Sequence, residues 1–352
     1  AAPEPADEDL PMPEPVPGVN TYGLDATLTD AALERAAELE PLQSLVIARH
    51  GEVMVAENLG GPGLDTPVNV KSVSKSILSA LVGRAIEEGY LDSTDQPIGP
   101  FVENYLTEDD DPRKRNITLA HLLTMQSGLE RTSGSNYGSW VSSSNWVRNA
   151  IRRPLHAAPG TARRYSTGNS HLLSAVLTQA TGQSTWAFAQ DYLAEPLGIR
   201  LPPWPTDPQG IYFGGNDMLI SPRDLLRFGE MYRQGGMYNG TRVLSNEWVR
   251  QSWIPRSESR WSGAGYGYSW FKRHVGAGYH ATYYGWGYGG QYLFIVPALE
   301  LTVVATSNPY HGTGRSHRTA VQEVILNMIV PAAEKGQAPV RPAHLTTRPD
   351  SP

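Results

Sequence analysis

Ser72 and Lys75 stand three positions apart at the polar start of a segment whose apolar residues recur at helical spacing. Residues three apart on a helix share one face, so this spacing brings a hydroxyl and an amine together. Serine is a weak nucleophile that needs a base within about 2.6–3.2 Å, and a lysine can be that base if burial lowers its pKa. The segment therefore predicts Ser72 as a nucleophile and Lys75 as its base. A serine that only caps a helix is the alternative for an isolated match.

The start of this helix also offers a place for negative charge. Free backbone N–H groups and the helix dipole both favour an anion there. The N–H of Ser72 is thus a candidate donor to an oxyanion.

A second chemical motif is Tyr165-Ser166-Thr167-Gly168-Asn169, in a loop directly before a helix predicted over residues 170–180. A tyrosine held at a loop–helix junction can face a cleft. With an ammonium nearby, its hydroxyl can move a proton between serine and a leaving group. A packed loop tyrosine beside a Thr167 or Asn169 cap is the alternative interpretation.

A third motif is the glycine-rich run from Tyr283 to Gln291, just before an apolar strand. Glycines there let another backbone or a substrate approach closely. An exposed N–H at Tyr288 would complete an oxyanion hole with that of Ser72. A turn of purely structural value is the alternative.

The surrounding elements indicate how these motifs are positioned. Strand-like runs at 44–49 and 52–56 flank His50-Gly51, and runs at 291–296 and 301–307 flank a second short turn, so each pair predicts a hairpin. The middle of the chain is mostly helical. We therefore predict an α/β (α+β) fold, with an antiparallel sheet built from both chain ends, flanking helices and an inserted, mostly helical lobe at about 95–210.

The domain boundaries follow composition. Residues 1–26 form an acidic, proline-rich leader that we expect to be flexible, 27–332 a single catalytic domain, and 333–352 a flexible tail. The chain starts Ala1-Ala2-Pro3, small residues of the kind that signal-peptide cleavage leaves. We expect an exported protein, periplasmic or secreted, with its signal peptide already removed.

Composition excludes several classes of function. There are no cysteines, hence no disulfides or thiolate chemistry, and the nine histidines show no metal-binding spacing, so we expect no metal and no cofactor. The first forty residues hold ten acids and one arginine, which leaves a charge of +3 on the rest of a chain whose net charge is −6. Without a basic run, nucleic-acid binding lacks support. No apolar run approaches the ~18 residues of a membrane span.

We expect a small-molecule ester or amide as partner and take a monomer as the default.

The order and spacing of the three motifs resemble the serine β-lactamase and penicillin-binding-protein superfamily. The resemblance is to its class C branch, which includes family VIII carboxylesterases, D-amino-acid peptidases and 6-aminohexanoate-oligomer hydrolases. It covers about residues 28 to 330 and includes the segments 122–129, 195–199 and the helix after Ser221. It implies a β-lactamase-like fold and an acyl-enzyme mechanism. In that mechanism Ser72 attacks, Lys75 and Tyr165 move the proton, and the N–H groups of Ser72 and Tyr288 hold the oxyanion; which of Lys75 and Tyr165 is the acylation base stays open.

Two departures from the family pattern bear on the substrate. Thr167 stands where the second motif has Asn, with Asn169 two residues on, and Gly285-Trp286-Gly287 stands where the third motif begins with Lys, His or Trp. The register Tyr283-Tyr284-Gly285 is the alternative for the third motif. These five positions, Thr167, Asn169, Gly285, Trp286 and Gly287, are the candidate substrate-binding residues. Residues of these types are expected to bind a substrate carboxylate less strongly than the residues of the family pattern.

We therefore predict a serine hydrolase of the carboxylesterase or amidase type. The alternatives are a β-lactamase or D-amino-acid peptidase, and a binding protein that keeps the fold without turnover. Tyr137, Trp140 and Trp146 either wall the cleft or pack among themselves. Arg315 and His317 are candidates to reach the cleft mouth.

Overall fold

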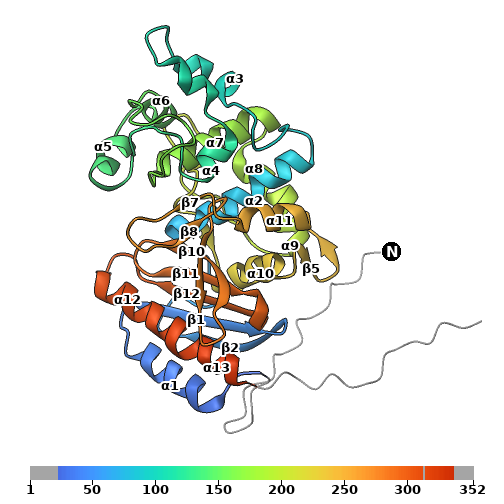
Figure 1. Cartoon of the computed structure of the whole chain (residues 1–352). Helices are drawn as coiled ribbons and strands as arrows, with labels where there is room; N and C mark the ends of the chain where they lie inside the picture. The colour runs from blue at the N-terminus through green and yellow to red at the C-terminus, as the bar shows by residue number, and fades with distance from the viewer. Residues whose placement is uncertain (1–22, 312–313, 337–352) are drawn as a thin grey trace, which may run out of the picture.

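The central element of the protein, seen in a computed structural model (Figure 1), is an eight-stranded antiparallel sheet. The structure describes residues 23–311 and 314–336. The strand order is β2-β1-β12-β11-β10-β9-β8-β7. The strands are β1 (Leu42–Arg49), β2 (Glu52–Asn58), β7 (Ser257–Glu258), β8 (Gly265–Tyr266), β9 (Phe271–Val275), β10 (His280–Gly287), β11 (Gln291–Val296) and β12 (Leu301–Ser307).

Strands from the two chain ends are neighbours within this sheet, because β1 pairs with β12 along its length. Both predicted hairpins are confirmed, β1 with β2 and β11 with β12. The first turns at His50 and Gly51, both with positive φ, a conformation that glycine adopts without strain. The predicted fold class, a sheet from both termini with an inserted helical lobe, is confirmed.

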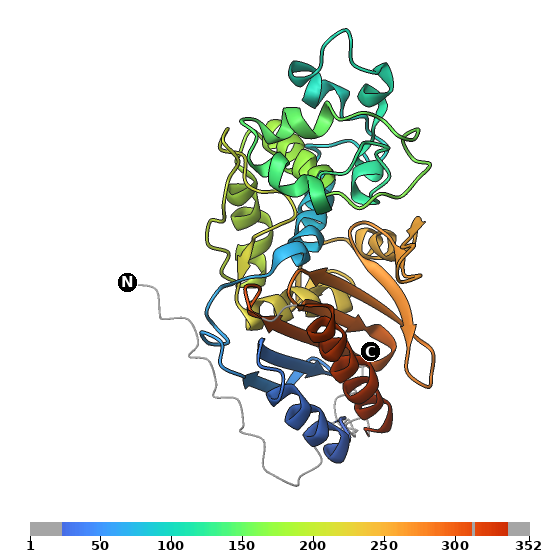
Figure 2. The ribbon, with the colours of Figure 1, turned by 90° about the vertical axis from the view of Figure 1, so that its left-hand side faces the viewer.

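One face of the sheet is covered by helices that come from both ends of the chain. The first helix, α1 (Ala26–Ala37), packs against the last helical run, which is α12 (Arg315–Val324), a π-helical turn η7 (Ile325–Ile329) and α13 (Val330–Lys335). Figure 2 shows α1 and α12 side by side on this face. The last helix extends through Lys335, beyond the start of the predicted tail at 333. Most of the predicted leader (1–22) and tail (337–352) lies outside the described residues.

The opposite face of the sheet carries α10 (Pro222–Arg233) and the start of α2 (Ser74–Glu87). Ser221 caps α10 by accepting the N–H of Asp224, and Pro222 occupies its first position, where a missing N–H costs nothing. Beside these lie α11 (Asn246–Trp253) and two short ribbons, β3 (Val68–Asn69) with β4 (Leu219–Ile220) and β5 (Met237–Tyr238) with β6 (Thr241–Arg242).

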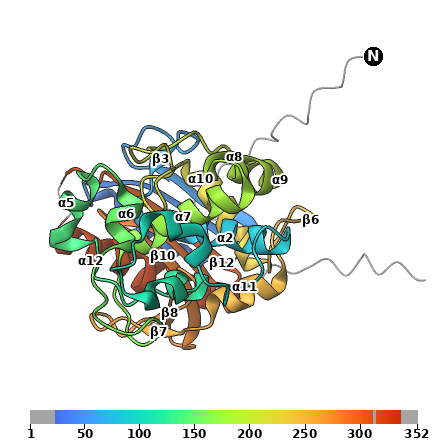
Figure 3. The same cartoon turned by 90° about the horizontal axis from the view of Figure 1, so that it is seen from above.

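The helical lobe sits over one edge of the sheet, with α2 leading from the sheet into it (Figures 1 and 3). Its central helix is α7 (Thr167–Thr181), which contacts α2, α4 and α6 and ends at Gly182 in the left-handed conformation. The other helices are α3 (Gly99–Val102), α4 (Leu119–Leu123), α5 (Tyr137–Val141), α6 (Trp146–Ile151), α8 (Thr185–Ala189) and α9 (Glu195–Leu197), with a π-helical turn at Gln190–Ala194 and short 3-10 turns.

Across the described ranges, no helix combines the length and apolar character needed to cross a membrane.

Candidate active site

Ser72 lies where the sheet, the helical lobe and α2 meet. It occupies a 3-10 turn, η1 (Lys71–Val73), that runs directly into α2, and this turn packs against β10. Lys71, directly before Ser72, has a positive φ of 47°, and the N–H of Val70 donates to Met218 O at 3.1 Å. The backbone is therefore held in a sharp bend where it enters the turn. The sequence placed Ser72 at a helix start. The structure adds that the first turn is 3-10.

Lys75 is the best-defined group of the site. Its Nζ lies 2.9 Å from Ser72 Oγ, 3.2 Å from Thr167 Oγ1 and 2.7 Å from the carbonyl oxygen of Gly215. The residue is only 2% exposed. Burial lowers the pKa of Lys75 from 10.5 to about 7, against the opposing charge of Asp217. A large fraction of this lysine is therefore a neutral amine near pH 7, in contact with a serine hydroxyl.

Tyr165 completes the predicted group of three. Lys75 Nζ lies 5.0 Å from the centroid of the Tyr165 ring, and the Tyr165 hydroxyl is close enough to Ser72 to interact with it. Burial raises the pKa of Tyr165 to about 12, while the interaction with Ser72 and the charge of Arg163 act in the other direction. At neutral pH this side chain is therefore a protonated phenol. The structure thus brings Ser72, Lys75 and Tyr165 together.

The loop from Gly214 to Asp217 is part of the site, and sequence reasoning missed it. Gly215 has a φ of +73°, and a Cβ there would lie 2.7 Å from Lys75 Cγ, so only glycine lets its carbonyl reach the amine. Asp217 accepts hydrogen bonds from Lys71 Nζ at 3.0 Å and Asn69 Nδ2 at 2.9 Å. The run Gly-Gly-Asn-Asp is a clear turn signal. Nothing in it indicated that the turn would close over a lysine.

Two glycines of the third motif, Gly285 and Gly287, lie in β10 itself, and the other two, Gly289 and Gly290, lie in the turn that follows. A Cβ on Gly287 would meet Val70 O at 2.4 Å and Lys71 Cβ at 3.0 Å, whereas one on Gly285 would meet Ser76 Oγ at 3.1 Å. Both glycines therefore face the segment that carries Ser72.

Trp286 points to the opposite face of β10, because neighbouring side chains of a strand alternate. Its ring lies 4.9 Å from the guanidinium carbon of Arg318, on the side of α12. The expectation that the Trp286 side chain contacts substrate beside Ser72 is therefore corrected. Tyr288, the first residue after β10, is 61% exposed.

The two candidates of the second motif have separate environments. Thr167 is buried, receives the bond from Lys75 and also bonds Ser133 Oγ at 3.2 Å, so it supports the amine. Asn169 is 2% exposed, and its Oδ1 accepts from Ser127 Oγ at 2.9 Å. Helix α7 begins at Thr167, three residues before the predicted start, which turns Asn169 into the helical lobe. Substrate binding by the Asn169 side chain is therefore also corrected.

The other aromatic and polar candidates divide between core and rim. Trp140 and Trp146 are buried, so the packing alternative holds for both. Tyr137 Oη accepts a hydrogen bond from Asn216 Nδ2 at 2.9 Å and so contacts the 214–217 loop. His317 is buried and bonds Ser307 Oγ at 3.0 Å, which removes it from the cleft mouth.

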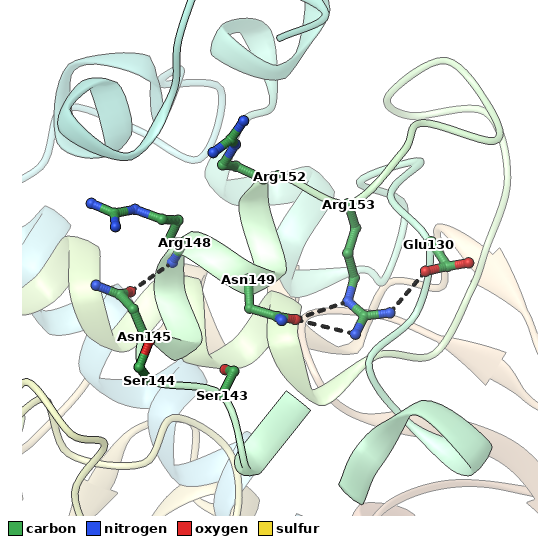
Figure 4. Close-up of a pocket in the computed structure, with 8 residues that line it drawn as sticks. All are labelled: Glu130, Ser143, Ser144, Asn145, Arg148, Asn149, Arg152 and Arg153. Atoms are coloured by element: carbon green, nitrogen blue, oxygen red, sulfur yellow. Dashed lines mark hydrogen bonds and ion pairs between the residues drawn. The ribbon is translucent and has the colours of Figure 1, made fainter. Parts of the chain in front are cut away.

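A separate hollow of about 550 Å³ lies beside α6 (Figure 4). Two of its arginines already have acidic partners, Arg153 with Glu130 at 2.8 Å and Arg152 with Asp110 at 3.4 Å. The residues that line it are Glu130, Ser143, Ser144, Asn145, Arg148, Asn149, Arg152 and Arg153. None of these belongs to the group around Ser72.

The described part of the chain contains no cluster of three or more His, Cys, Asp or Glu side chains able to hold a metal ion.

A buried lysine amine against a serine hydroxyl, on a sheet built from both chain ends with an inserted helical lobe, defines a β-lactamase-like protein. The sequence pattern of the family described as Beta-lactamase matches residues 39–326. The chain belongs to this family, which confirms the resemblance found in the sequence.

Two curated relatives are similar over part of their length. Esterase EstB of Burkholderia gladioli is 30% identical over 50% of this chain and 50% of its own. The 6-aminohexanoate-dimer hydrolase of Paenarthrobacter ureafaciens is 26% identical over 66% of this chain and 62% of its own. The chain thus spans about half to three-fifths of these relatives.

Among solved structures, a "Putative 6-aminohexanoate-dimer hydrolase from Bacillus anthracis" superposes with a TM-score of 0.71 at 18% identity. The match covers 86% of this chain and 81% of that one. At this identity the likeness shows the fold alone.

The close approach at Gly287 gives a first prediction. Gly287→Ala should lower the rate at which a fluorophosphonate labels Ser72 by about 10²-fold, the usual cost of displacing a reacting group by about 1 Å. The reason is that the new methyl group would lie 2.4 Å from Val70 O, in the backbone leading to Ser72. The rate is measured by intact mass spectrometry.

Gly285→Ala is the matched control on the same face of β10. Its methyl group would meet the Ser76 hydroxyl at 3.1 Å, and a side-chain end can move away. Equal labelling rates for the two variants would contradict the proposed role of the Gly287 contact.

Proposed function

We propose that this protein is a serine hydrolase that cleaves small neutral esters or amides through an acyl-enzyme. The observation that carries the proposal is the 2.9 Å contact between Lys75 Nζ and Ser72 Oγ in a site that lowers the pKa of Lys75 to about 7. A nucleophile and a base matched in this way are what covalent catalysis requires. A protein that only binds a ligand has no use for them.

Acylation begins with proton transfer from Ser72 to Lys75. The neutral amine accepts the proton as Ser72 Oγ attacks the substrate carbonyl. Below pH 7 Lys75 is increasingly an ammonium ion and cannot accept, so activity should rise with pH through about 7. Of the two candidates for the base, we propose Lys75, because a phenol with a pKa of about 12 keeps its proton at neutral pH.

Tyr165 then acts as the proton carrier to the leaving group. Its hydroxyl contacts Ser72 and its ring lies beside the Lys75 amine, so it can donate its proton to the departing oxygen or nitrogen and recover one from Lys75. The N–H groups of Ser72 and Tyr288 stabilise the oxyanion. Attack by water on the acyl-enzyme reverses these transfers and releases the acid.

The side chains around Ser72 support a neutral substrate. Thr167 is already bonded to Lys75 and Ser133, Gly285 has no side chain, and the ammonium of Lys71 is paired with Asp217 at 3.0 Å. A substrate carboxylate would have to displace one of these partners. The names of the two curated relatives, an esterase and an amide-dimer hydrolase, support the same choice.

Exposed aromatic rings near this segment favour apolar acyl or aryl groups. Tyr288 follows β10 and is 61% exposed, and Tyr310, whose ring centroid is 5.3 Å from Lys71 Nζ, is 75% exposed. Such rings supply apolar contact area at the mouth of a ligand site.

The direct test of this function is removal of the nucleophile. Ser72→Ala should lower kcat/KM for nitrophenyl butyrate by several orders of magnitude and abolish the fluorophosphonate adduct. Ser79→Ala is the matched control, because the Ser79 hydroxyl lies in the same helix and finds no partner among the described residues. If Ser72→Ala retained a tenth of the wild-type activity, another residue would be the nucleophile.

Substrate class is tested by comparing kcat/KM for nitrophenyl butyrate, a chromogenic cephalosporin and a D-Ala-D-Ala peptide in one buffer. A charge-assisted hydrogen bond to a carboxylate is worth roughly 1.5–3 kcal/mol, so a site lacking one should favour the ester by about 10-fold or more. Faster turnover of the cephalosporin or of the peptide would replace the ester proposal by that alternative.

A further inference from the structure

His171 is a fully buried polar residue in the helical lobe that the mechanism above does not use. It lies in α7, and its ring is surrounded by Trp140, Trp146 and Phe213, with centroids 5.9, 5.4 and 5.9 Å away. A polar ring in such surroundings is costly unless both nitrogens are hydrogen-bonded.

Both nitrogens of His171 are hydrogen-bonded, and the partners fix the tautomer. The N–H of Gly214 donates to Nδ1 at 3.1 Å, and since a backbone N–H can only donate, Nδ1 carries a lone pair. The proton is then on Nε2, which lies 2.9 Å from Asp207 Oδ2. The other oxygen of Asp207 accepts the N–H groups of Gln209 and Ile211 at 2.8 and 2.9 Å. His171 is thus held as a neutral acceptor aimed at Gly214.

Gly214 is one residue before the carbonyl that bonds Lys75. A Cβ on Gly214 would lie 2.3 Å from Ser170 O, and one on Gly215 would lie 2.7 Å from Lys75 Cγ, so this backbone packs directly on α7 and on the lysine. The bond from Gly214 to His171 therefore sets how closely the loop covers the amine. Loosening that bond would move the Gly215 carbonyl and admit water to Lys75.

We propose that His171 and Asp207 are positioning residues for Lys75: they hold the 214–217 loop against the amine through the Gly214 N–H. This inference rests on the proposed function, since it assigns the loop a task in preparing the base. The competing explanation is that the pair only stabilises the helical lobe.

Two substitutions of His171 separate these explanations, because each keeps only one of the two hydrogen bonds that the His171 ring makes. In His171→Asn the amide oxygen falls near the position of Nδ1 and can still accept from Gly214, but the link to Asp207 is lost. In His171→Gln the amide falls near Nε2 and can still reach Asp207, but Gly214 loses its acceptor. In Asp207→Asn, the side-chain amide can donate a hydrogen bond to Nε2 of His171. The ring proton then lies on Nδ1, where it faces the Gly214 N–H, and Gly214 again loses its acceptor.

The kinetic readout is the pH profile of kcat/KM for nitrophenyl butyrate. We expect His171→Gln and Asp207→Asn to lose about 10²-fold in kcat/KM. Their acid-side midpoint should move above that of the wild type, because burial is the main cause of the low pKa of Lys75 and an open loop hydrates the amine. His171→Asn should keep the wild-type midpoint. If thermal stability falls in all three while the midpoint stays constant, the pair has only a structural role and the proposal is overturned.

Hydrogen exchange of the backbone amides of residues 214–217 provides a readout that needs no catalysis. In a Ser72→Ala background, exchange should be faster with His171→Gln than with His171→Asn. Equal exchange would overturn the inference whatever the activity. A wild-type protein without esterase activity would instead refute the proposed function, while the exchange result still decides whether His171 holds the loop. Should Asp207→Asn fail to fold, the two His171 variants decide alone.

Discussion

The exclusion of water from the Lys75 amine is the constraint on which the site depends. A shift from 10.5 to about 7 corresponds to roughly 5 kcal/mol at about 1.36 kcal/mol per pKa unit. Because the folded-state pKa is lowered, this cost to folding is absent above about pH 10.5 and is fully present below about pH 7. The fold sustains it because the amine finds three oxygen partners, on Ser72, Thr167 and Gly215, within a well-packed core.

Those partners come from different parts of the chain, so the site exists only when the whole domain is assembled. Ser72 is in the turn before α2, Thr167 begins α7 in the helical lobe, and Gly215 lies on the connection back to the sheet. Gly287 of β10 lets the sheet approach the Ser72 segment. Pairing of β1 with β12 then ties this arrangement to both chain ends.

The sequence was sufficient for the elements and residues whose signals are local. The hairpins follow from apolar runs around turn residues, and α10 from its Ser-Pro start. Ser72 and Lys75 follow from helical spacing, which a 3-10 turn at the start disturbs little. Tyr165 needed the family resemblance, because a lone loop tyrosine has no specific signal.

The remaining features depend on the packing of distant segments. Gly215 and Asp217 reach the site through a left-handed turn, and nothing in the local sequence indicates which segment this turn will contact. Asn169 was misplaced because α7 begins three residues early, so a residue expected in the loop lies in the first turn of the helix, where it bonds Ser127. Trp286 was misplaced because the glycine-rich run is a strand, in which neighbouring side chains point to opposite faces. His171 gives no sign in the sequence that Asp207 and Gly214 will contact it.

The most direct test of the account is titration of the Lys75 side chain itself by NMR, following its ¹³Cε resonance with pH and assigning it by comparison with Lys75→Ala. We predict a midpoint near 7 for the resonance of Lys75. A midpoint above about 9 would show that Lys75 remains an ammonium ion at neutral pH, and it would contradict the assignment of Lys75 as the base that activates Ser72.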